Sequence, residues 1–174
     1  MNQIATPDRQ VFFLNDPVSF KLTVGTRSLE AQLVSTAFIE GNGYLFHIKF
    51  NDGHEGGYEL DSHCIYNSDG TQDEYCQALK DEIYNPLFCW TEDSKIFVVN
   101  FTLNKVERNI WVLEHYHSEK KERYYSVYAG NEYQFTLKKT GGEWVTHIPE
   151  AYGERVTDPG LLKKVISAIH YYNK

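Results

Sequence analysis

The chain has 174 residues, of which 41% are hydrophobic, 15% aromatic and 24% charged. This composition is typical of a folded globular protein with one or two domains, and it excludes an intrinsically disordered chain. The net charge of −7 argues against duplex nucleic acid and membranes as partners, because phosphate groups and anionic lipid surfaces repel an acidic protein.

The negative charge is concentrated in the first half of the chain. Residues 1–87 contain 5 Lys or Arg and 13 Asp or Glu, a balance of −8, whereas residues 88–174 contain 12 and 11, a balance of +1. The first ten residues do not have the pattern of a signal peptide, and no apolar run approaches the length of a membrane span. Three cysteines without a C-x-x-C spacing are typical of a reducing compartment, so we expect a cytoplasmic protein.

Alternation of apolar and polar residues predicts strands in both halves. In the first half the expected strands cover residues 9–14, 18–24, 29–33, 44–50 and 58–66. In the second half they cover residues 96–103, 106–116, 123–128, 133–137 and 144–145. The strand at 106–116 has apolar residues at consecutive positions, which predicts that it is buried on both faces.

Each run of strands is followed by signals of a helix. A capping box at Thr71–Glu74 predicts the start of the first helix, and Pro86 predicts its end near residues 84–85. Asp158 followed by Pro159 is typical of the start of a second helix. Its apolar stripe consists of Leu161, Val165, Ile169 and Tyr172. Strands followed by a helix, twice, predict the α+β class: a mainly antiparallel β-sheet with two α-helices.

Two stretches of the chain are alike. Residues 41–53 (GNGYLFHIKFNDG) and residues 130–142 (GNEYQFTLKKTGG) are identical at six of thirteen positions and lie 89 residues apart, and the expected helices end in Tyr-Asn pairs 88 residues apart. These landmarks favour a duplicated unit of four or five strands and one helix, with halves at 1–87 and 88–174, packed as two lobes or as one continuous domain. The alternative is chance, because Gly-Asn turns and alternating aromatic residues recur in antiparallel sheets.

A pair of histidines is the clearest candidate for chemistry. His115 and His117 are two residues apart, so on a strand both rings lie on the same face, as two ligands of a zinc or copper site would. A third ligand would come from His47, His54, His63, Cys64 or His147. The alternative, which we favour, is two solvated histidines at a strand end, with no bound metal.

Other catalytic patterns are missing or have a simpler explanation. The sequence contains no G-x-S-x-G, P-loop, H-E-x-x-H or EF-hand motif. His63 and Cys64 are adjacent, so on a strand they point to opposite faces and do not form a nucleophile–base pair. The run at 120–125 (KKERYY) combines basic and aromatic residues, as single-stranded nucleic-acid sites do, but an exposed turn explains it as well. We therefore expect no cofactor and no catalytic residues.

The sequence favours a non-enzymatic cytoplasmic protein that binds another protein, with a basic partner as the favoured kind. The residues expected at its interaction surface are Asp52, Glu55, Glu59, Asp61, Tyr124 and Tyr125. One alternative is a small-ligand-binding protein with an aromatic-lined pocket between sheet and helix. A third is an enzyme with a dispersed site centred on histidine.

Overall fold

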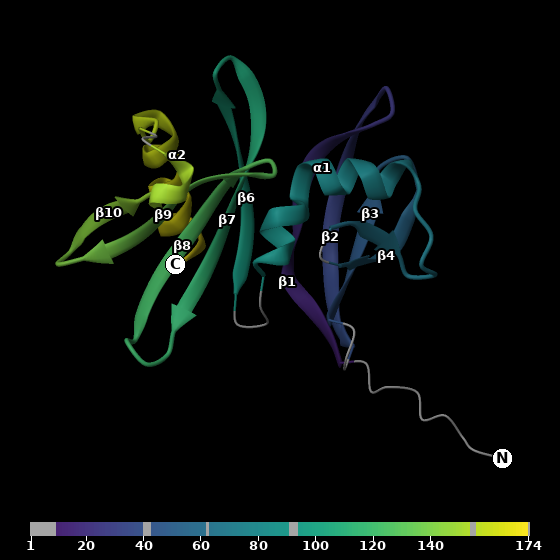
Figure 1. Cartoon of the computed structure of the whole chain (residues 1–174), viewed down its shortest axis with the longest axis horizontal. Helices are drawn as coiled ribbons and strands as arrows, with labels where there is room; N and C mark the ends of the chain where they lie inside the picture. Colours follow the sequence, from purple (N-terminus) through teal and green to yellow (C-terminus); the bar gives the residue numbers. More distant parts are fainter. Residues whose placement is uncertain (1–9, 40–42, 62, 91–93, 154–155, 174) are drawn as a thin grey trace. The chain divides into compact units, whose positions relative to one another are not determined.

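A computed structural model describes residues 10–39, 43–61, 63–90, 94–153 and 156–173, and it confirms the α+β class. The chain divides into two compact units, residues 1–84 and residues 85–174, which we call unit 1 and unit 2. Each unit contains a five-stranded antiparallel sheet whose strands are neighbours in the order of the sequence (Figure 1).

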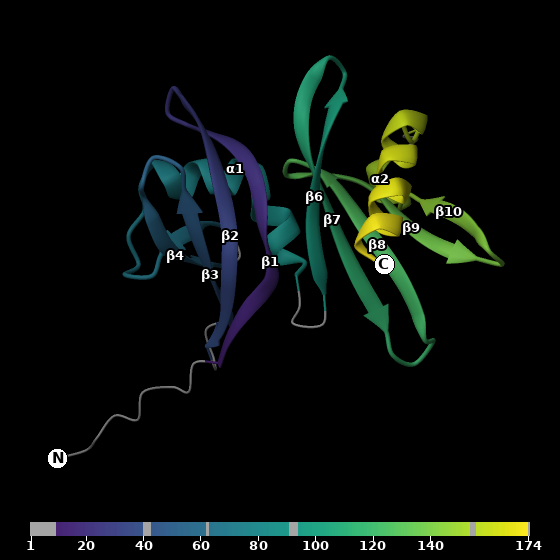
Figure 2. The same cartoon turned by 180° about the vertical axis from the view of Figure 1, so that it is seen from behind.

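Unit 1 consists of one sheet with a helix on one of its faces. The strands are β1 (Gln10–Val24), β2 (Arg27–Ile39), β3 (Gly43–Phe50), β4 (Glu55–Leu60) and β5 (Ile65–Asn67). Helix α1 (Glu74–Phe88), whose last four residues belong to unit 2, covers one face of the sheet (Figures 1 and 2). Alternate strand residues such as Phe20, Leu33 and Ile48 are buried, together with Leu79 and Ile83 of α1. The residues between them on the strands are mostly polar and exposed, which is the pattern of a sheet with one wet face.

Strand β1 is continuous, whereas the sequence predicted two strands at 9–14 and 18–24. The pairing of β1 with β2 changes register between Phe13 and Val18, so an irregularity in the ladder takes up the extra residues. Because β1 is the edge of the sheet, Pro17 can lack its N–H without removing a bond from the ladder.

The start of α1 differs from the predicted capping box. The helix begins at Glu74, and the Asp73 Oδ1 atom accepts a hydrogen bond from the backbone N–H of Cys76 at 2.9 Å. Thr71 instead donates its hydroxyl to Asp69 at 2.6 Å. Asp73 is therefore the N-cap, because its side chain is the one that reaches a free N–H of the first turn.

The end of α1 also lies beyond the predicted position. The helix contains Pro86 and continues to Phe88, and the backbone N–H of Cys89 donates to the Asn85 oxygen at 3.1 Å. A proline removes its own backbone hydrogen bond and crowds the carbonyl four residues earlier, but the bond from Cys89 to Asn85 shows that the turn containing Pro86 still closes.

Unit 2 has the same order of elements. Its strands are β6 (Lys95–Leu103), β7 (Val106–His117), β8 (Glu122–Ala129), β9 (Glu132–Thr140) and β10 (Glu143–His147), followed by the short 3-10 helix η1 (Glu150–Tyr152) and α2 (Pro159–Tyr172). Helix α2 covers one face of the sheet (Figure 2). Its residues Leu161, Val165 and Ile169 form a hydrophobic core with strand residues such as Val127 and Leu137.

Two predictions about unit 2 are confirmed. Strand β7 is buried on both faces, since the consecutive residues Ile110–Leu113 are all fully buried. In α2, Asp158 is the N-cap, and its Oδ1 accepts from the Leu161 N–H at 2.8 Å; the helix ends at Tyr172. Neither described helix is long and apolar enough to cross a membrane.

The similar stretches noted in the sequence do not occupy equivalent places in the two sheets. Residues 41–53 include β3, the third strand of unit 1, whereas residues 130–142 include β9, the fourth strand of unit 2. The third strands, β3 and β8, begin at Gly43 and Glu122, which are 79 rather than 89 residues apart. The two units share their order of strands and helix, but the matching stretches fall on non-equivalent strands. The match therefore does not confirm a duplication.

Candidate functional site

A pocket of about 370 Å³ in unit 2 lies between the sheet and the start of α2. This volume is within the range of small-molecule sites, about 300–1,000 Å³. Its apolar lining residues are Leu103, Phe135, Ile148, Val156, Pro159 and Leu161. Its polar lining residues are Asn104, Gln134, Thr157 and Asp158. Phe135 is the one aromatic residue among these described lining residues, whereas the sequence suggested an aromatic lining.

A tight turn and a helix cap shape this pocket. The turn between β6 and β7 has two residues with positive φ, Asn104 at 51° and Lys105 at 67°, as in the type I′ turn that suits the twist of a hairpin. This turn places Leu103 and Asn104 on the pocket wall. On the other side, the bond from Asp158 to the Leu161 N–H fixes the first turn of α2. One wall therefore rests on the β6–β7 hairpin and the other on the start of α2, whereas Ile148, Val156 and Thr157 lie outside the helices and strands.

The pocket presents both polar and apolar surface, and its polar residues offer hydrogen-bond acceptors. The Nε2 atom of Gln134 donates to the backbone oxygen of Glu132 at 3.1 Å, which leaves Oε1 able to accept. Asp158 is the only acidic residue among the described lining residues, and one of its two oxygens caps the helix. The geometry suits a molecule with an apolar body and one polar group.

Val156 is the most exposed of the described large apolar side chains that line this pocket. Its exposed fraction is 94%, although it also lines the pocket. Burial of an exposed valine side chain stabilises by about 1.5–3 kcal/mol. A ligand in the pocket could therefore gain affinity by covering Val156.

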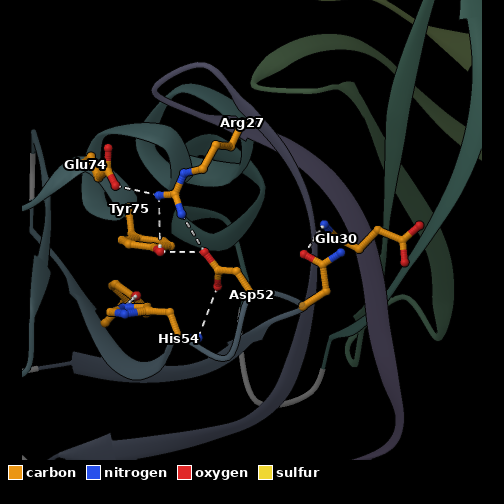
Figure 3. A network of polar contacts seen from close by, with 8 residues as sticks. Arg27, Glu30, Asp52, His54, Glu74 and Tyr75 are labelled. Carbon is orange, nitrogen blue, oxygen red and sulfur yellow. Dashed lines mark hydrogen bonds and ion pairs between the residues drawn. The ribbon is translucent and has the colours of Figure 1, made fainter.

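A second group of polar side chains lies in unit 1 (Figure 3). The two terminal nitrogens of Arg27 donate to Asp52 at 2.9 Å and to Glu74 at 2.6 Å. The Tyr75 hydroxyl donates to Asp52 at 2.7 Å, and its ring stacks on His54 with 3.9 Å between centroids. These contacts join the start of β2, the β3–β4 turn and the start of α1, so they hold three segments of unit 1 together.

Hydrogen bonds in this network favour the charged forms of Asp52 and Arg27. The hydrogen bond from the Tyr75 hydroxyl lowers the pKa of Asp52, with help from the backbone N–H of His54. The pKa of Arg27 is raised, first by its hydrogen bond with Tyr75. Both groups therefore remain ionised and paired at neutral pH. Because its polar groups already bind each other, we interpret this network as structural.

The four acidic residues expected at an interaction surface are spread along β4. Asp52 precedes the strand and binds Arg27; Glu55 forms an ion pair with Lys49 at 3.5 Å. Glu59 is half-buried within β4. Asp61 follows the strand and accepts two backbone N–H groups at 2.8 and 2.9 Å. A six-residue strand is roughly 20 Å long, so the first and last of these carboxylates do not lie together.

The two tyrosines expected at the same surface lie on opposite faces of β8. Tyr124 is half-buried and stacks on His115, with 4.8 Å between ring centroids. Tyr125 is only 4% exposed, and its hydroxyl accepts from the Asn173 amide at 3.0 Å. Tyr125 therefore belongs to the core under the end of α2, and we leave it out of any proposed surface.

The candidate histidine pair stands apart from other metal ligands. The Nδ1 atom of His115 lies 3.2 Å from the Ser94 hydroxyl, and burial lowers the pKa of His115. Within the parts of the chain that the structure describes, no three or more His, Cys, Asp or Glu side chains gather as a metal site. The Cys64 sulfur lies 3.8 Å from the Lys80 Nζ atom.

The sequence did not single out Arg27, Tyr75 or the pocket residues as a group. The partners of Arg27 are 25 and 47 residues away in the chain, and no local pattern predicts such contacts. For the pocket, the sequence predicted two strands at 96–103 and 106–116 and a helix start at Asp158, but not that they meet. Comparison of the chain with protein-family models, curated proteins and solved structures gives no match.

Proposed function

We propose that this protein is a non-catalytic binding protein and that the pocket at the start of α2 holds a small molecule. The observation that carries the proposal is the pocket itself: about 370 Å³ with six apolar lining residues and a few polar groups. An apolar cavity with a small number of fixed polar groups is the usual form of a small-molecule site. The exposed Val156 side chain supports the same proposal.

The polar groups of the pocket favour binding over catalysis. Acid–base catalysis usually needs two titratable groups whose pKa values are held apart. Asp158 is the one titratable residue among the described lining residues, and its Oδ1 atom already accepts the Leu161 N–H. The lining residues therefore favour ligand binding over acid–base catalysis.

Native mass spectrometry of the protein purified from its own host tests this proposal. We expect a mass above that of the bare chain, and we expect the Gln134→Trp variant to lose it because the indole fills the pocket. Gln32→Trp, on an exposed strand position of unit 1, is the matched control and should retain the added mass. A mass excess that survives in Gln134→Trp would place the ligand elsewhere. A bare mass, together with no pocket resonance shifted by a fragment mixture, would reject the proposal.

The charge distribution favours a second proposal, that unit 1 binds a basic protein partner in the cytoplasm. Residues 1–84 contain 5 Lys or Arg and 13 Asp or Glu, and such an excess accelerates association with a basic surface. Of the residues expected there, the Asp61 side chain accepts two backbone N–H groups of its own loop, whereas Glu55 forms an ion pair with Lys49.

Charge reversal tests this second proposal. We expect Glu55→Lys with Glu59→Lys to weaken binding of an oligolysine peptide, and raised salt to do the same because it screens exposed charges. The control is Glu143→Lys with Glu150→Lys, at exposed positions of unit 2. Equal weakening by both pairs would show a net-charge effect and would contradict a surface on unit 1.

A further inference from the structure

We propose that the pocket at the start of α2 selects an organic cation, namely a molecule with an apolar body that carries an ammonium group. This inference rests on the proposed function of the pocket and names the chemical class of its ligand. It is unexpected at first sight, because the N-terminus of a helix normally attracts anions through its free N–H groups and its dipole.

The first turn of α2 has few N–H groups left for an anion. Pro159 has no N–H, and the Leu161 N–H donates to the Asp158 side chain at 2.8 Å. The Leu162 N–H donates to the Asp158 backbone oxygen at 3.0 Å. Of the first turn, this leaves the N–H of Gly160. The donors that would bind a phosphate or carboxylate are therefore largely used within the helix start.

The charge at this helix start also favours a cation. The dipole of a helix places about half a positive charge at its N-terminus, whereas the Asp158 carboxylate brings a full negative charge to the pocket wall. Among the described lining residues the charge balance is therefore negative. Lys105, which follows Asn104 in the β6–β7 turn, is not among the lining residues, so it does not reverse this balance on the wall.

The hydrogen-bond acceptors and the apolar walls of the pocket also suit an organic ammonium ion. Asp158 has a second carboxylate oxygen beyond the one that caps the helix, and Gln134 has its Oε1 atom. Leu103, Val156 and Leu161 supply apolar walls. An ammonium group can donate to both acceptors while its hydrocarbon chain contacts the walls.

An NMR titration of the whole chain with three probes of equal chain length tests the inference: n-hexylammonium, hexan-1-ol and hexanoate. The readout is the methyl signals of Leu103, Val156 and Leu161. We expect n-hexylammonium to bind roughly tenfold more tightly than hexan-1-ol, because a charge-assisted hydrogen bond is stronger than a neutral one. Hexanoate should give no saturating shift.

The Asp158→Asn variant separates charge from capping, because asparagine caps a helix as well as aspartate does. We expect the preference for n-hexylammonium over hexan-1-ol to fall from roughly tenfold to near unity. An unchanged preference in Asp158→Asn, or tighter binding of hexanoate than of n-hexylammonium, would overturn the cation class. In either case binding of hexan-1-ol at the pocket methyls would leave the proposed function standing. If none of the three probes shifts these methyls, both proposals fail.

Discussion

Lys105 has a backbone conformation that costs free energy. Its φ is 67°, and Asn104 before it has a φ of 51°. Asparagine tolerates the left-handed region, whereas a residue such as lysine pays roughly 1–2 kcal/mol there because its Cβ approaches the backbone. The turn between β6 and β7 keeps this strain because both strands are paired up to the turn, from Leu103 and Val106 onward.

Replacement of Lys105 by glycine is therefore expected to stabilise the protein. Glycine adopts positive φ without a Cβ clash, although it loses more entropy on folding, so the expected gain is up to about 1 kcal/mol in the free energy of unfolding. Urea denaturation measures this gain. Lys105→Ala removes the same charge and length but keeps the Cβ, so it should show no gain. Equal stability of the two variants would contradict the strain.

Single residues show where prediction from the sequence works and where it cannot. The cap of α2 was predictable because Asp158 and Leu161 are three residues apart. The cap of α1 was placed two residues too early, because Thr71 and Asp73 both have suitable side chains and only the three-dimensional structure shows that Asp73 reaches Cys76. The Arg27 network and the pocket join distant segments, and no local pattern encodes those contacts.

For helix α2 as a whole, the sequence also predicted one part of the structure and missed another. Its stripe of apolar residues predicted one buried face, and the structure buries Leu161, Val165 and Ile169 while Lys163 and Ser167 remain exposed. Tyr172, predicted in the stripe, is 48% exposed but stacks on Phe97 with 4.5 Å between ring centroids. The period of a helix thus predicted which face packs, but not that the packing would leave a pocket at its start.

The packing of α2 leads to a prediction about stability. Ile169 is 2% exposed within the core of unit 2, so Ile169→Ala should lower the free energy of unfolding by about 2–5 kcal/mol through the cavity that it leaves. Tryptophan fluorescence during urea denaturation measures this loss. Ser167→Ala, on the exposed face, should change stability by less than about 0.5 kcal/mol. Similar effects of both variants would show that α2 does not pack on the sheet by this face.

The whole molecule combines two units with different responses to acid. In unit 1, the pKa values of Asp52, Asp61 and Asp69 are lowered, by hydrogen bonds from Tyr75, from the His63 backbone and from Thr71, respectively. In unit 2, burial lowers the pKa of His115. A group with a lowered pKa in the folded state stabilises above its unfolded pKa, and this stabilisation is lost as the pH falls through the folded value.

We therefore expect unit 2 to lose stability first on acidification, from about pH 6.5, the unfolded pKa of histidine, and unit 1 only below about pH 3.8, that of aspartate. All three tryptophans, Trp90, Trp111 and Trp144, belong to unit 2, so their fluorescence follows urea unfolding of that unit. Hydrogen exchange of the β2–β3 amides reports unit 1. Because glutamine does not titrate, His115→Gln should remove the early decline in the urea midpoint that tryptophan fluorescence measures. The variant should leave hydrogen exchange in β2–β3 unchanged. If wild type and His115→Gln decline together between pH 6.5 and pH 5, a group other than His115 controls the acid response of unit 2.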